Sequence, residues 1–149
     1  MKSNRAIPPA SVVPVLVYPD VRAAVEWLSE VFGFVERTRI GENHRSQMSI
    51  GHDGAVIVAD VRGAQVAPTP GAVTQLVRVR VEDADALHAR ISDRIQGRGG
   101  EVLSAPEDQM FGERDFTVED LAGHRWAFCE TIRDVAPEEF DCETISPWP

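Results

Sequence analysis

Cysteine is scarce in this chain, which argues against a small secreted domain held together by disulfides. Cys129 and Cys142 are the only two cysteines in 149 residues. Small secreted domains that depend on disulfides carry many more. Cys129 falls in a segment that reads as a strand, whereas Cys142 lies in an acidic C-terminal stretch. We therefore expect one small buried residue and one free, exposed thiol rather than a disulfide, and we expect a cytoplasmic protein.

Long apolar runs are missing as well. The longest, such as residues 55–59, are far too short to cross a bilayer. The N-terminus, M-K-S-N-R-A-I-P-P-A, lacks the apolar stretch that a secretory signal needs. We expect residues 1–10 to form a flexible leader, and we expect no membrane partner.

Basic residues are in the minority. The 15 Lys and Arg stand against 24 Asp and Glu, which gives a net charge of −9. Such an excess of acid argues against a nucleic-acid partner. It is compatible with steering a cationic ligand toward the protein, but ordinary solubility explains it more simply.

Motifs for several common chemistries are absent too. The sequence has no GxGxxG, no P-loop and no Ser-His-Asp arrangement. The length is that of one ordinary domain. The hydrophobic content of 43% and the charged content of 26% are typical of a soluble globule.

What the sequence does contain is an internal repeat. In the first half, an apolar strand over residues 12–18 is followed by Asp20, which can cap a helix that begins at Val21. Gly33 is placed to end this helix. Period-two patterns and turn signals then predict three more strands, at residues 34–40, 45–50 and 55–59.

The second half repeats this order. A strand over residues 73–81 leads to Asp83, a second helix cap, and to a helix with an apolar stripe. Three strands follow, at residues 101–103, 114–118 and 125–129. Two β-α-β-β-β units, joined by a linker over residues 62–72, therefore make up the chain.

The most informative stretch runs from Phe111 to Phe128, F-G-E-R-D-F-T-V-E-D-L-A-G-H-R-W-A-F. Phe116 and Val118 alternate with polar residues and predict a strand, and Gly123 can take a positive φ in the acidic turn that follows. This pattern resembles the terminal hairpin of the vicinal oxygen chelate superfamily. That superfamily includes glyoxalase I, extradiol dioxygenases and the fosfomycin- and bleomycin-resistance proteins.

The resemblance covers about residues 11–132 and implies an α+β fold. In such proteins two βαβββ units, here about residues 11–61 and 73–132, form curved mixed sheets around a cavity. Small open sheets leave surface uncovered, so the resemblance also implies a homodimer. Residues 133–149 are expected to form an acidic tail.

Members of this superfamily that bind a divalent metal carry ligands on the first strand of each unit and on the last strand. The resemblance places these positions at Val13, Leu76 and Ala127. None of these side chains can coordinate a cation. The sequence therefore resembles a branch that lacks the metal site, and we expect no metal and no cofactor.

Strand alternation predicts which side chains face the cavity. On residues 74–81 the valines should pack on the helix, so Leu76 and Arg78 should face the cavity. Arg78 suits a carboxylate or a phosphate; the alternative is a surface arginine on a two-faced sheet. On the last strand, Arg125 and Ala127 should face the same side.

Three further residues are candidates for the cavity wall. Gln47 lies on the polar side of a middle strand. This polar side either lines the pocket or faces water. Phe111 stands in an aromatic-Gly-x-Arg loop and could act as a lid. Arg114 could be a cation at the rim, or half of an exposed ion pair with Glu113 or Asp115 that contributes little.

Two functions from different classes follow from this pattern. The first is a metal-free binding protein that sequesters a small molecule in a cavity between its βαβββ units, as the bleomycin-resistance branch does. The second is an enzyme of the glyoxalase superfamily, a lyase, isomerase or dioxygenase, that acts on a small anionic substrate.

Overall fold

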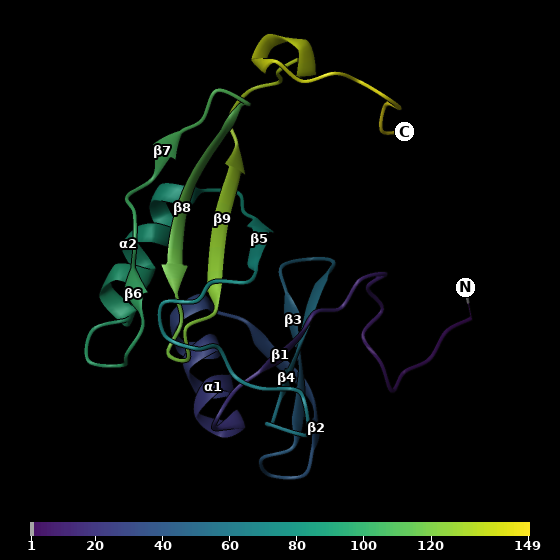
Figure 1. The fold of residues 1–149 in the computed structure, drawn as a ribbon, viewed down its shortest axis with the longest axis vertical. Coiled ribbons are helices and arrows are strands. Elements are labelled where there is room, and N and C mark those ends of the chain that lie inside the picture. Colours follow the sequence, from purple (N-terminus) through teal and green to yellow (C-terminus); the bar gives the residue numbers. More distant parts are fainter. Residues whose placement is uncertain (1) are drawn as a thin grey trace.

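The first half of the chain forms a four-stranded sheet with one helix on its face. The computed structural model describes residues 2–149 (Figure 1). The strands are β1 (Val15–Val17), β2 (Val35–Ile40), β3 (Arg45–Ile50) and β4 (Gly54–Ala59), in the order β1-β4-β3-β2. Strand β1 runs parallel to β4, and the other pairs are antiparallel. Helix α1 (Val21–Trp27) continues into a π-helical turn, Leu28–Phe32.

The second half repeats this connectivity, so the α+β fold of two βαβββ units is confirmed. Its strands β5 (Leu76–Arg80), β6 (Glu101–Val102), β8 (Glu113–Glu119) and β9 (Arg125–Thr131) stand in the order β5-β9-β8-β6. Helix α2 (Ala84–Arg94) connects β5 to β6. A short strand that the sequence pattern does not predict, β7 (Glu107–Asp108), pairs with β8. Two residues are too few to show a period.

Both helices begin where the sequence predicts. The Asp20 carboxylate accepts a hydrogen bond from the Ala23 N–H at 3.0 Å, and the Asp83 carboxylate accepts one from the Ala86 N–H at 2.8 Å. Each bond satisfies a backbone donor that has no partner within its own helix. Gly33 follows the first helix with a φ of 79°, a left-handed conformation that favours glycine.

The helix-facing sides of the two units share one hydrophobic core. The Phe32 ring lies 4.9 Å from the Phe128 ring and 5.6 Å from the Trp126 ring, measured between centroids. Trp27 and Val118 are also buried in this core. Because the shared core lies on the helix side of each sheet, the opposite faces of the sheets stay open (Figure 1).

A buried polar network ties the turn between β8 and β9 to the first unit. Asp120 is 2% exposed, and its carboxylate accepts from the Tyr18 hydroxyl at 2.6 Å and from the Trp126 indole Nε1 at 3.1 Å. It also accepts from two backbone N–H groups, those of Ala122 and His124, each at 3.0 Å. Burial, together with the charge of Asp120, raises the pKa of the Tyr18 hydroxyl well above its usual value.

His124 is part of the same connection between the units. Its Nε2 lies 2.8 Å from the Val17 carbonyl oxygen, so Nε2 carries the hydrogen and donates it. Its Nδ1 then accepts from the Gln75 side-chain amide at 2.9 Å. The Nε2 bond joins the two units, whereas the Nδ1 bond lies within the second unit.

The terminal segments project from the two-unit body (Figure 1). The tail contains a 3₁₀ helix, Pro137–Phe140, that the sequence pattern does not predict. The Phe140 ring lies 6.2 Å from the Phe111 ring, so the tail starts against the loop that precedes β8. None of the helices within residues 2–149 is long and apolar enough to span a bilayer.

Candidate functional site

Four of the predicted site residues lie together on the open face of the second sheet. Leu76 pairs with Arg125 across β5 and β9, and Arg78 pairs with Ala127. Leu76 is 49% exposed, whereas Ala127 is only 3% exposed between its neighbouring strands. Val77, which alternates with these residues, packs against the core as predicted.

The arginines of this face already have carboxylate partners. The Arg78 guanidinium donates a hydrogen bond to the Glu113 carboxylate and lies 6.0 Å from the centre of the Phe111 ring. The Arg125 Nε donates to the Glu119 carboxylate at 2.8 Å. An anionic ligand would have to displace Glu113 to reach Arg78, so the face is less basic than its arginines suggest.

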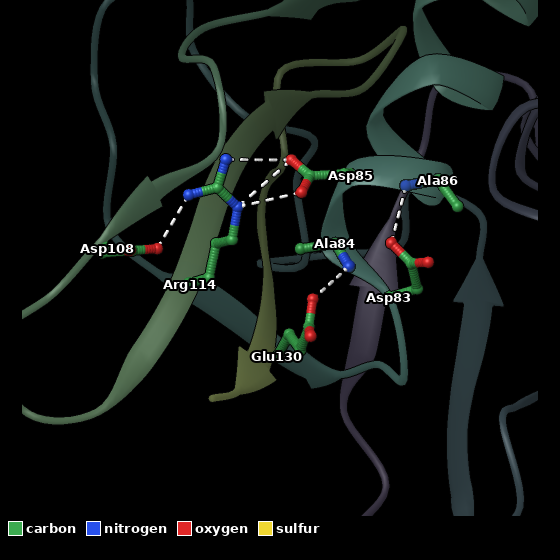
Figure 2. Close-up of polar contacts among 7 residues, drawn as sticks. All are labelled: Asp83, Ala84, Asp85, Ala86, Asp108, Arg114 and Glu130. Atoms are coloured by element: carbon green, nitrogen blue, oxygen red, sulfur yellow. Dashed lines mark hydrogen bonds and ion pairs between the residues drawn. The ribbon is translucent and has the colours of Figure 1, made fainter. Parts of the chain in front are cut away.

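Arg114 does not lie on this face. The predicted ion pair with Glu113 or Asp115 is wrong. Strand alternation turns Arg114 to the helix side of β8 and leaves Glu113 and Asp115 on the open side. There the Arg114 guanidinium donates to Asp85 on α2 at 3.0 Å and to Asp108 on β7 at 2.7 Å (Figure 2). Hydrogen bonds to these two carboxylates raise the pKa of Arg114. Arg114 therefore ties α2 and β7 to β8.

The two predicted residues of the first unit, Gln47 and Val13, lie apart from this face. The Gln47 side-chain amide on β3 donates to the Ala6 carbonyl at 3.0 Å and so holds the leader. Val13 precedes β1. Both of its chain neighbours line a pocket of about 320 Å³, together with the β5 residues 77–80.

One group with metal-binding potential was missed by the sequence analysis. Ligand atoms of Glu113, Asp115 and Cys129 lie within 4.8 Å of one another on the open face. Strand alternation on β8 and β9 could have found it. Burial raises the pKa of the Cys129 thiol to about 11, with Arg78 opposing the rise and the two carboxylates adding to it.

The two cysteines stand as predicted. Cys129 is buried, Cys142 is exposed, and neither forms a disulfide. The two carboxylates of the metal-capable group also have partners of their own, since Glu113 binds Arg78 and Asp115 accepts from the Gln109 amide at 3.1 Å.

A large hollow lies between the two units. Its volume is about 770 Å³, within the range of roughly 300–1,000 Å³ that small-molecule sites occupy. The first unit contributes residues 32–34 and the β3–β4 turn, residues 50–53; the second contributes the end of β5, the start of α2 and the end of β9. We call this hollow the inter-unit cleft.

The inter-unit cleft has an apolar floor and a polar rim. Phe32, Phe34 and Phe128 form the aromatic part of the floor, and Val79 and Leu87 extend it. The residues 50–53 also border the 320 Å³ pocket, which lies toward Arg78. The sequence analysis missed this cleft because its walls come from separate units whose relative placement no local pattern reveals.

Comparison with known proteins decides the family. Residues 11–128 match the model of the Glyoxalase/Bleomycin resistance protein/Dioxygenase superfamily. The chain belongs to this superfamily. The resemblance drawn from the terminal hairpin is therefore confirmed, and so is the fold that it implied.

Relatives and solved structures of this superfamily cover most of the chain. TioX from Micromonospora sp. ML1 is 31% identical, with a TM-score of 0.65 over 80% of this chain and 96% of TioX. An uncharacterised protein of Mycobacterium tuberculosis is 28% identical over 142 residues, which cover 89% of this chain and 81% of the relative.

A third similar structure has a bound ligand. The bleomycin-binding protein from Streptomyces verticillus, complexed with copper(II)-bleomycin, matches with a TM-score of 0.58 and 23% identity. The match covers 82% of this chain and 96% of the bleomycin-binding protein. At this identity the likeness shows the shared fold. It also shows that a member of this superfamily binds a small molecule.

Proposed function

We propose that this protein is a metal-free small-molecule-binding protein that sequesters its ligand in the inter-unit cleft. The observation that carries this proposal is the cleft of about 770 Å³ with walls from both units. An apolar floor with a few polar groups at the rim is the usual construction of a ligand site.

The residues at the superfamily's ligand positions support the metal-free part of the proposal. Val13, Leu76 and Ala127 offer no donor atom to a divalent cation. In the group of Glu113, Asp115 and Cys129, both carboxylates already have protein partners, Arg78 and the Gln109 amide.

The binding function is favoured over the enzymatic alternative. A lyase, isomerase or dioxygenase that acts on an anionic substrate would need a free cation on the open face. Arg78 already pairs with Glu113, and Arg125 pairs with Glu119, which leaves Arg80, a contact of Thr131, as the one arginine of β5 and β9 without a carboxylate partner among residues 2–149. Leu76, Arg78 and Phe111 do not line the inter-unit cleft, to which β5 contributes Val79 and Arg80 instead.

A homodimer is part of the proposal. Four apolar side chains, Val15, Val35, Ile40 and Leu76, are 41–51% exposed. A second copy that covered them would remove this apolar surface from water. We also propose a cytoplasmic location, which fits the free thiol of Cys142.

The binding function can be tested with a neutral dye. Nile red should bind the purified protein and brighten with one site per chain, and an excess of EDTA should leave this binding unchanged. Leu87→Trp fills the cleft and should weaken the binding at least about tenfold, because the dye loses its space on the floor. Leu103→Trp adds the same ring outside the cleft and should leave the binding unchanged. Absence of dye binding, or equal effects of the two variants, would sink the proposal.

The metal-free part has its own measurement. Elemental analysis of the dialysed protein should show well under one equivalent of zinc, iron, nickel or manganese. One equivalent that disappears in Asp115→Asn would show instead that the open face holds a metal.

A further inference from the structure

We infer that the inter-unit cleft selects an organic cation: an apolar, ring-containing body that carries a protonated amine. This inference rests on the proposed function, because it names the ligand class for the same cleft. It follows from the aromatic floor and from the distribution of charge around the rim.

The floor offers aromatic rings from both units. Phe32 and Phe34 come from the segment after α1, and Phe128 comes from β9. The three rings are 1–6% exposed, so they give the cleft an apolar floor against which a flat apolar body can lie. The floor thus suits the body of the ligand.

The rim is strongly acidic. Four carboxylates, those of Asp53, Glu82, Asp83 and Glu130, line the cleft against a single guanidinium, that of Arg80. The Arg80 side chain contacts Thr131 rather than any of the four acids.

These four carboxylates have no ion-pair partner within 4.0 Å in residues 2–149, the part of the chain that the structure describes. Four other acids of the second unit do pair with arginines: Glu113 with Arg78, Glu119 with Arg125, and both Asp85 and Asp108 with Arg114. The unpaired acids of the cleft rim can therefore accept a cation from outside the protein.

The first turn of α2 holds two of these carboxylates in place. Glu130 reaches from β9 so that one carboxylate oxygen accepts the Ala84 N–H at 2.8 Å, and one oxygen of Asp83 accepts the Ala86 N–H (Figure 2). These bonds orient both carboxylates. Each carboxylate keeps a second oxygen that can accept a hydrogen bond from an amine.

Charge complementarity also excludes the opposite ligand. A carboxylate or phosphate placed in the cleft would lie beside four negative groups, which are opposed by Arg80 and by Arg90, whose guanidinium lies beside Gly33. The net charge of −9 adds a long-range attraction for cations. A cationic amine is therefore the class that the cleft favours, in contrast with the anionic substrate of the enzymatic alternative.

The test compares three probes that share one naphthyl body. These are 2-(1-naphthyl)ethylamine, which is protonated at pH 7, the neutral 2-(1-naphthyl)ethanol and the anionic 1-naphthylacetate. Titration calorimetry at 50 mM salt should rank the amine first and the carboxylate last. The amine should bind roughly tenfold more tightly than the carboxylate, the combined effect of several exposed charge contacts. Salt at 0.5 M should narrow this gap and leave the alcohol unaffected.

A matched pair of double variants locates the effect. Asp53→Asn with Glu82→Gln removes two charges from the rim and should weaken amine binding about threefold to tenfold. Glu107→Gln with Glu143→Gln removes the same charge away from the cleft and should leave amine binding unchanged. Equal effects of the two double variants would overturn the inference.

The outcomes also separate this inference from the proposed function. If the alcohol and the amine bind equally well, the cleft is a ligand site without charge selection, and only the cation inference fails. If none of the three probes and no Nile red binds, the proposed function fails with it.

Discussion

At the scale of single residues, Asp120 has the largest structural role. Its carboxylate accepts four hydrogen bonds in a buried position, and the Tyr18 hydroxyl reaches it from the first unit. A buried charge is tolerated only when donors surround it. The same network orients the turn between β8 and β9 and fixes how the second unit meets the first.

Tyr18→Phe should lower the free energy of unfolding by about 1.5–3 kcal/mol, the range for a hydrogen bond to a charged group. The lower end is expected, because three other donors remain on Asp120. Urea unfolding measures the change. An unchanged free energy of unfolding would mean that the carboxylate does not depend on Tyr18.

Cys129 should make the protein less stable at alkaline pH. Its thiol has a pKa of about 11 in the folded chain, above the value of about 8.5 for a free cysteine. As the pH rises above about 9, the unfolded chain loses this proton first, so the free energy of unfolding falls until the folded pKa is reached. Tyr18, whose pKa is also raised, acts in the same direction.

Cys129→Ala should therefore flatten the decline in the free energy of unfolding between pH 9 and 11, as measured by urea unfolding at several pH values. The absolute stability of this variant will differ because it loses a buried sulfur, so the slope with pH is the relevant quantity. A wild-type free energy of unfolding that rises across this pH range would contradict the burial of the thiol.

At the scale of elements, the loop after α2 is held against α1. The Trp27 indole Nε1 donates to the Gly99 carbonyl at 3.0 Å. Gly100 has a φ of 80°, and a Cβ at this position would lie 2.7 Å from both the Glu119 carbonyl oxygen and the Trp27 ring. Glycine is therefore required here for its conformation and for the close approach of three elements.

Gly100→Ala and Gly97→Ala form a matched pair. Gly97 has a φ of 72° and nothing within 4 Å of a Cβ, so its substitution should cost only the left-handed conformation, about 1–2 kcal/mol. Gly100→Ala should cost about 1–3 kcal/mol more because of the overlap. Thermal and urea unfolding of the two variants measure the difference. Equal losses would show that the contact with Trp27 relaxes without cost.

Local patterns were enough to predict most of the elements. Asp20 and Asp83 cap the two helices, and alternation on β5 and β9 places Val77 and Trp126 in the core. The partners of Arg114 could not be predicted, because α2 and β7 reach it only through the packing of the second unit. The alternation of residues along a strand predicts which way a side chain points, but it does not predict which distant segment that side chain contacts.

At the scale of the whole molecule, the relative placement of the units decides the function. Contacts of Phe32 with Phe128 and of Tyr18 with Asp120 lock the units together and leave the inter-unit cleft beside them. The sequence predicted a cavity between the units but placed its lining on the open sheet faces. Only the packing of one unit on the other reveals the acidic rim and the aromatic floor.

The open faces should be covered in a homodimer. Light scattering at micromolar concentration should give twice the 16.4 kDa of one chain. Leu76→Glu places a charge on the open face and should shift the protein toward the monomer, whereas Ile145→Glu, in the exposed tail, should not. A monomeric wild-type protein would refute the dimer.

The central claim, that a small molecule binds in the inter-unit cleft without a metal, is tested most directly by a map of amide chemical shifts. The neutral naphthylethanol probe, added to ¹⁵N-labelled protein in EDTA, should shift the amides of residues 50–54 and 79–83. Residues 133–149 should stay unchanged. Shifts confined to the open face around Thr117 and Glu119, or no shifts without added metal, would contradict the account.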